Sequence, residues 1–152
     1  MIEKTELNRG WTLSCNVTAR PDLPAEIPAQ VPGCVHLDLL ANRLIPDPYL
    51  AVNETANDWI GKEDWTYRCS FDASPDAGKV HELVFDGLDT VATIVLNGED
   101  LGQTFNMHRT YRFDVSERLK HGANELVVTF RSAYAYGAEM EQKRLMPVAL
   151  GE

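Results

Sequence analysis

Residues 85–98 read FDGLDTVATIVLNG and predict two strands, each followed by a turn. Residues 83–85 end an apolar run, and the Asp-Gly-Leu-Asp sequence after it has turn chemistry. Residues 91–96 are β-branched or apolar throughout, as expected of a strand buried on both faces. Asn97-Gly98 is a strong hairpin signal, because both central residues of a type I′ turn need positive φ. The stretch predicts a sheet on either side of it and has no obvious catalytic group.

Segments with strand patterns surround this hairpin. Residues 11–17 and 65–72 alternate between apolar or aromatic and polar side chains, which is typical of half-buried strands. Further strands are predicted at 79–86, 101–104, 111–115 and 125–132, a short helix at 35–42 and one capped helical turn at 116–124. Residues 19–32 contain four prolines and are predicted to form a surface loop. Seven or eight short strands and one short helix predict an all-β fold, an antiparallel β-sandwich or jelly roll.

The composition excludes several classes of function. A net charge of -9 over 152 residues argues against nucleic acid or an anionic membrane as the main partner. No apolar run is long enough to span a membrane and no signal-peptide core follows Met1, so a cytoplasmic location is expected. The three cysteines and four histidines lack metal-ligand spacing, and there is no P-loop, GxGxxG or GxSxG motif. We expect neither a metal site nor a cofactor.

The segment from Ile45 to Asp64 has no strand or helix pattern and is predicted to be a long irregular loop. Its mixture of aromatic, carboxamide and acidic side chains is typical of carbohydrate sites. The candidate substrate-binding residues are Asp47, Tyr49, Asn53, Glu54 and Trp59. The alternative, which the bare pattern slightly favours, is that Tyr49 and Trp59 only cap the end of a sandwich.

The same segment contains acidic residues that invite comparison with a glycosidase: Asp47, Glu54, Asp58, Glu63 and Asp64. Glycoside hydrolysis needs two carboxyl groups held about 5–9 Å apart across a sugar. Nothing in the sequence places these residues on a rigid element, and acidic side chains in turns commonly bind their own backbone amides. No catalytic residue is predicted among them.

A series of sequence blocks resembles the N-terminal sugar-binding domain of family 2 glycoside hydrolases, and the β-mannosidase branch in particular. The blocks are VPGCVHLDLL at 31–40, IPDPY at 45–49, NE at 53–54, WIG at 59–61, DWTY at 64–67, FDGLDTVA at 85–92, LNG at 96–98, YRFDV at 111–115 and GANEL at 122–126. They occur in the family's order, and the resemblance extends from about residue 11 to about residue 132. It implies a galactose-binding-like jelly roll at 1–132 and a tail at 133–152 that is cut before the rest of the enzyme.

The resemblance also implies what this chain lacks. Such enzymes carry the two catalytic glutamates of a retaining mechanism on a (β/α)8 barrel, and β-mannosidases add a Trp-Asp-Trp-Gly-Pro block that reaches the substrate. Neither matches any part of the 152 residues, so we expect an inactive, non-catalytic domain. Its expected partners are the remaining hydrolase domains, a β-mannoside or related oligosaccharide in the intact enzyme, and a second copy through uncovered sheet edges. The alternatives are a free-standing carbohydrate-binding module and a structural interaction domain.

Overall fold

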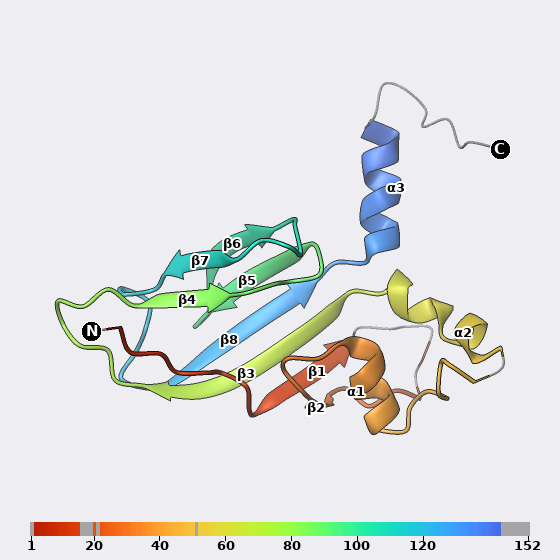
Figure 1. Cartoon of the computed structure of the whole chain (residues 1–152), viewed down its shortest axis with the longest axis horizontal. Helices are drawn as coiled ribbons and strands as arrows, with labels where there is room; N and C mark the ends of the chain where they lie inside the picture. Colours follow the sequence, from red (N-terminus) through yellow and green to blue (C-terminus); the bar gives the residue numbers. More distant parts are fainter. Residues whose placement is uncertain (1, 16–19, 21, 51, 144–152) are drawn as a thin grey trace.

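The computed structural model describes residues 2–15, 20, 22–50 and 52–143, and their chain path is shown in Figure 1. Within these ranges the strands are β1 (Trp11–Cys15), β2 (Ile27–Ala29), β3 (Trp65–Ala73), β4 (Glu82–Phe85), β5 (Ala92–Leu96), β6 (Glu99–Thr104), β7 (Tyr111–Asp114) and β8 (Gly122–Phe130). The helices are α1 (Val35–Ala41), α2 (Asn53–Ala56), the 3-10 helix η1 (Asp58–Lys62) and α3 (Ala133–Lys143).

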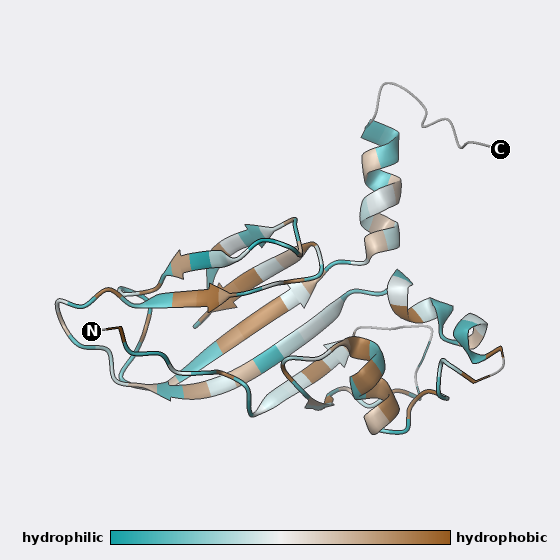
Figure 2. Ribbon diagram, in the orientation of Figure 1, coloured by the Kyte–Doolittle hydropathy of each residue, from teal (hydrophilic) through white to brown (hydrophobic). Residues whose placement is uncertain are grey.

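The strands form two antiparallel sheets. The larger sheet has the order β2-β1-β3-β8-β5-β6, and the smaller sheet pairs β4 with β7. Phe113 of β7 lies close to Gly102 of β6, where an added Cβ would be 3.4 Å from the Phe113 ring, so the sheets touch at this point. Figure 2 shows apolar residues along β4, β5 and β8 and on α1. The predicted all-β sandwich with the short helix α1 is confirmed.

The central hairpin has the predicted turn. Asn97 has φ 54° and Gly98 has φ 85°, both in the left-handed region that a type I′ turn requires. Residues 92, 94 and 96 of β5 are buried, whereas residues 93 and 95 are half-buried. The strand was expected to be buried on both faces, but only one face is fully covered. Strand β5 pairs with β6 and β8 in the larger sheet, and β4 belongs to the smaller one.

The alternating pattern of β3 is also confirmed. Trp65, Tyr67 and Cys69 are buried, Thr66 is half-buried, and Arg68 and Ser70 are exposed. In β1, Trp11 and Leu13 are buried and Cys15 is half-buried. Residue 17, expected on the same inward face, lies outside the described residues.

Three segments differ from the sequence-based expectation. The proline-rich loop predicted at 19–32 contains β2, a three-residue strand at the sheet edge, where Pro28 removes no hydrogen bond that a central strand would need. The predicted irregular loop at 45–64 contains α2 and η1, which are too short to produce an amphipathic period. Residues 133–143 form α3, which has no buried residue and projects away from the sheets beside η1 (Figure 1).

Candidate functional site

The 45–62 segment contains all five candidate substrate-binding residues, and its own side chains fix its first turn. The Asp47 carboxylate accepts a hydrogen bond from the backbone N–H of Tyr49 at 2.9 Å. Its backbone carbonyl accepts one from Nδ2 of Asn53, also at 2.9 Å. This is an Asx turn closed by a second amide, which is why two prolines around an Asp produce a defined bend here.

A second carboxamide closes the other end of the bend. Asn57 is only 2% exposed, and its Nδ2 donates to the backbone carbonyl of Pro46 at 3.2 Å. Its backbone N–H donates to the carbonyls of Asn53 and Glu54, which ends α2 and leads into η1. The Asp and Asn side chains therefore order the segment, and Asn57 was not predicted to take part.

The ordered bend exposes three apolar side chains to solvent. Tyr49 is 94% exposed, Leu50 61% and Val52 79%. We call these three residues the exposed apolar surface of the 45–62 segment. Glu54 lies beside them on α2 and is also exposed. The sequence-based reasoning selected Tyr49 but missed Leu50 and Val52, although an apolar run directly after a Pro-Asp-Pro turn was visible in the sequence.

Trp59 is less accessible than Tyr49. Its ring is half-buried against the ring of Trp65, with centroids 5.9 Å apart, and the Arg20 guanidinium lies 4.8 Å from its centroid. Trp65 is in turn anchored by its indole N–H, which donates to the Ile60 carbonyl at 2.9 Å. The two tryptophans are thus packed into the end of the sandwich, which is the alternative that the sequence left open for Trp59.

Three of the five acidic residues, Asp47, Asp58 and Asp64, bind neighbouring groups. The hydrogen bond from Lys62, together with its charge, lowers the pKa of the exposed Asp58 carboxyl, whereas a general acid needs a raised pKa. The Asp64 carboxylate accepts the backbone N–H of Ser132 at 2.7 Å. Both carboxylates therefore have evident structural partners.

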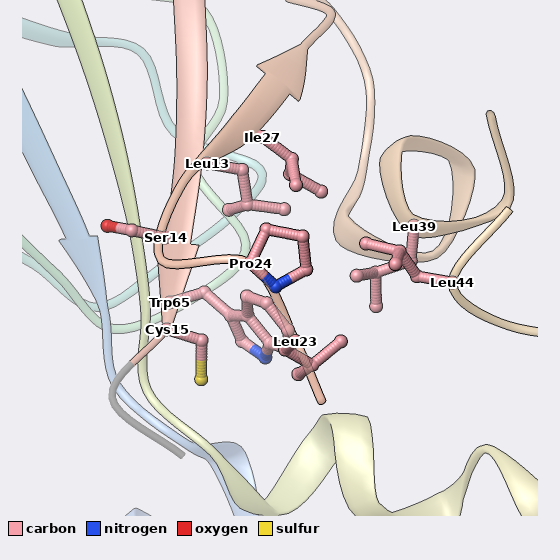
Figure 3. A pocket seen from close by; sticks show the side chains of 9 residues that line it. All are labelled: Leu13, Ser14, Cys15, Leu23, Pro24, Ile27, Leu39, Leu44 and Trp65. Atoms are coloured by element: carbon pink, nitrogen blue, oxygen red, sulfur yellow. The ribbon is translucent and has the colours of Figure 1, made fainter. Parts of the chain in front are cut away.

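A small apolar depression lies behind β1 and Trp65, as Figure 3 shows. Its cavity volume is about 10 Å³, room for about one water molecule, whereas drug-sized ligand pockets start at about 300 Å³. Burial, followed by the charges of Glu63 and Asp64, raises the pKa of the Cys15 thiol on its rim to about 12. A thiol held protonated in this way is a poor nucleophile. The depression does not resemble a sugar site or a catalytic site.

No group of three or more His, Cys, Asp and Glu side chains within the described ranges is arranged to hold a metal ion. None of the helices in the part of the chain that the structure describes is long and apolar enough to cross a membrane.

Comparison with known proteins supplies the family. The model of the "Glycosyl hydrolase 2 galactose-binding domain-like" family matches residues 11–150. Beta-mannosidase B of Thermothelomyces thermophilus is 43% identical over 125 residues, which are 82% of this chain and 15% of that protein. Beta-mannosidase of Bos taurus is 40% identical over 121 residues, 78% of this chain and 14% of that protein. The chain spans about one seventh of the length of these curated relatives.

Solved structures agree with this family. The crystal structure of the β-D-mannosidase of Dictyoglomus thermophilum matches 95% of this chain with a TM-score of 0.87 and 35% identity, over 18% of its own length. A β-glucuronidase from Ruminococcus gnavus matches 83% of this chain and 21% of its own, with a TM-score of 0.60 at 18% identity, and shares the fold alone. The chain therefore belongs to the family of galactose-binding-like domains of glycosyl hydrolase 2 enzymes, and its relatives include β-mannosidases.

Proposed function

We propose that this chain is a non-catalytic domain of a retaining β-mannosidase-like glycoside hydrolase. In that role it supports the catalytic barrel domain and shapes the rim of a site that binds a β-mannoside or a related oligosaccharide. The family and the names of the relatives support the choice of enzyme. The chain by itself is inactive in this proposal, because none of its 152 residues resembles the barrel that carries the two catalytic glutamates in such enzymes.

The observation that carries the proposal is the exposed apolar surface of the 45–62 segment. Tyr49, Leu50 and Val52 stand on a backbone that the Asp47 and Asn53 hydrogen bonds hold in place. Ordering such a segment while leaving its apolar side chains in water is unfavourable unless another surface covers them. In an enzyme about seven times longer, the neighbouring domains supply that surface, and Tyr49 is the residue we place at the sugar rim.

A free-standing carbohydrate-binding module is the second candidate, and the 94% exposure of the Tyr49 ring favours it. Aromatic faces that are open to solvent stack on sugars in many carbohydrate sites. Two of the three polar candidates are committed elsewhere, however, since the Asp47 and Asn53 side chains bind the backbone of their own loop. Glu54 is the third and is exposed. We therefore rank the module below the accessory domain.

Titration of the 152-residue chain with mannose, mannobiose and galactose separates the two candidates. The observable is tryptophan fluorescence, supported by calorimetry because the Trp59 ring is half-buried against Trp65, whereas the Tyr49 ring is exposed. If the chain is an accessory domain, it should show no saturable binding at sugar concentrations up to the millimolar range. It should also release no nitrophenol from a nitrophenyl β-mannoside. Saturable binding that Tyr49→Ser abolishes and Tyr134→Ser retains would establish the module instead, because Tyr134 is also well exposed, at 59%, but lies on α3.

The role in the intact enzyme needs a polypeptide that also contains a catalytic domain. There, Leu50→Ser with Val52→Ser is expected to lower thermal stability, and Tyr49→Ser to raise KM more than it lowers kcat. The matched control is Val80→Ser, which removes an apolar side chain that is 74% exposed in another part of the fold. If the three substitutions in the 45–62 segment change stability and kinetics no more than Val80→Ser does, the segment has no role at a domain contact or sugar rim.

A further inference from the structure

Asn97-Gly98 is the only Asn-Gly pair in the 152 residues, and this dipeptide has a known chemical weakness. The backbone nitrogen of the glycine can attack the Asn side-chain carbonyl carbon, because glycine has no side chain to hinder it. A C–N bond forms, the Cγ–Nδ2 bond breaks, and ammonia leaves with the amide proton. Water then opens the five-membered succinimide to Asp or to isoaspartate. No redox partner or cofactor is needed.

In the folded domain the Asn97 carboxamide is held away from this reaction. Its Nδ2 donates to the Arg118 carbonyl at 2.8 Å and to Oδ1 of Asn124 at 2.9 Å. Its Oδ1 accepts the backbone N–H of Glu125 at 3.0 Å. The backbone N–H of Asn97 also donates to the Glu125 carbonyl, at 2.8 Å. Turning the carboxamide toward the Gly98 nitrogen would break all three side-chain hydrogen bonds.

The partner Asn124 is itself fixed. It is 2% exposed, accepts the Lys120 N–H at 2.8 Å, and donates to the carbonyls of Lys120 and Gly122 at 2.9 and 2.8 Å. A buried amide with four hydrogen bonds has little freedom to release Asn97. The turn before β8 and the β5–β6 turn are thereby locked together.

We infer that Asn97 is a latent deamidation site whose reaction is blocked by the Asn124 network for as long as the domain is folded. The Asn97 side chain must give up three hydrogen bonds to reach the reactive rotamer. At ordinary net strengths, this cost makes the rotamer about tenfold or more rarer in the folded domain than in the unfolded chain. Global unfolding, or opening of the β5–β6 hairpin, removes the block. This inference concerns the scaffold and does not depend on the proposed function.

Reaction would prevent a full return to the native hairpin. The side chain of an aspartate at position 97 has no N–H to donate, so the Arg118 carbonyl and the Asn124 oxygen would face a negative charge. An isoaspartate would add a methylene to a two-residue turn whose φ angles are already restricted to the left-handed region. The fraction of chains converted at Asn97 therefore increases irreversibly with the time that they have spent unfolded.

The test compares the same 152-residue chain in buffer and in concentrated urea at pH 8 and 37 °C. Aliquots are digested, and the peptide containing residues 97 and 98 is followed by its mass gain and by the separation of its aspartate and isoaspartate forms. We expect conversion to be at least about tenfold slower in buffer, after correction for the effect of urea on a short synthetic peptide of the same sequence. Equal corrected rates in both solvents would overturn the inference.

Asn124→Ala tests the assignment of the block to this network. If the variant folds, as judged by circular dichroism, conversion in buffer should accelerate several-fold while the rate in urea stays the same. A folded variant that converts no faster than the parent would refute the role of Asn124. If the variant does not fold, the comparison of the parent chain in buffer and urea still decides the main inference.

Discussion

Tyr67 donates a hydrogen bond from its hydroxyl to Oδ2 of Asp38 at 2.8 Å, and both residues lie in the interior. Asp38 is 3% exposed and Tyr67 6%. The other carboxyl oxygen of Asp38 accepts the backbone N–H of Gln30 at 2.8 Å. The Asp38 side chain of α1 thus connects the helix to β3 and to Gln30, which lies between β2 and α1. The contact explains why an acidic residue is tolerated on the inward face of an otherwise apolar helix.

Tyr67→Phe should destabilise the domain because it leaves a buried Asp38 oxygen without its donor. Hydrogen bonds that involve a charged or strongly polar partner are worth about 1.5–3 kcal/mol, so we expect a loss of that size in the free energy of unfolding. Urea denaturation at pH 7 measures it. Tyr49→Phe is the control, since Tyr49 is 94% exposed and should change stability by less than about 0.5 kcal/mol. Equal midpoints for the two variants would contradict the prediction.

The stability of the domain should fall in alkaline solution. Burial and the hydrogen bond to Asp38 raise the pKa of Tyr67 above its ordinary value of 10.0, and burial raises that of Cys15 from 9.0 to about 12. The unfolded chain then loses these protons at a lower pH than the folded chain. The stability is therefore fully present below pH 9 and declines as the pH rises from 9 toward 12.

Urea midpoints measured from pH 8 to pH 11 test this dependence. Burial also raises the pKa of the Cys69 thiol, so Cys15→Ser removes one of two such thiols. The midpoint of the variant should decline less steeply than the parent's between pH 9 and pH 10. Tyr67→Phe should have a lower urea midpoint than the parent at pH 8. Its midpoint should decline less steeply than the parent's only above pH 10. Parallel curves for all three proteins would show that neither group is responsible.

The central hairpin was predictable because its information is local. Asn97-Gly98 specifies the turn through φ angles that few other residue pairs adopt, and the strand before it is β-branched or apolar throughout. The hydrogen bonds from Asn97 to Asn124 and to Arg118 were not predictable, since they join positions 27 and 21 residues apart. Sequence patterns identify the turn but not its distant partners. Strand β2 was missed for the same reason, because only its pairing with β1 makes it a strand.

The candidate site shows the same limit at the level of single side chains. Asp47 and Asn53 have the chemistry of sugar ligands, yet in the structure they bind the backbone of their own loop. Residue type gives the donors and acceptors available and leaves open which of them the fold itself will use. Tyr49, by contrast, remains a candidate because almost all of its surface is exposed.

Gly61→Ala should loosen α3 without unfolding the domain. An added Cβ at position 61 would lie 2.9 Å from the Tyr134 ring, which packs there above η1 and extends its hydroxyl toward Asp58. Tyr134 is 59% exposed and can swing away, so the global free energy of unfolding should change by less than about 0.5 kcal/mol. Hydrogen exchange of residues 133–143 should become faster.

The matched control for this change is Gly137→Ala on the same helix. Apart from the backbone of α3 itself, no heavy atom of the described residues lies within 4 Å of an added Cβ there. Alanine stabilises a helix interior by up to about 1 kcal/mol relative to glycine. Exchange in α3 should therefore become slower. If both alanine variants slowed exchange, Tyr134 would not anchor the helix.

Asn97→Asp should lower stability although it changes only one amide into a carboxylate. The variant loses both donors of the Asn97 side chain and brings a charge against two carbonyl-type oxygens, which is expected to cost about 1–3 kcal/mol. Asn106→Asp is the control, because Asn106 uses only its oxygen, which accepts the His108 N–H at 2.9 Å. Thermal melting should separate the two variants clearly. Comparable melting temperatures would mean that the donors of Asn97 contribute little.

The exposed apolar surface of the 45–62 segment should cause the chain to self-associate when no other domain covers it. Leu50 and Val52 are 61% and 79% exposed, and burying such side chains between two copies is favourable. The net charge of -9 opposes the contact, so added salt should promote association by screening the repulsion. Sedimentation equilibrium should give an average mass that rises above 17.0 kDa with concentration and with salt. The double substitution Leu50→Ser with Val52→Ser should abolish this rise in mass, and the control Val80→Ser should leave it unchanged. If association survives the double substitution, it must come from another surface, such as the edges of the β4–β7 sheet.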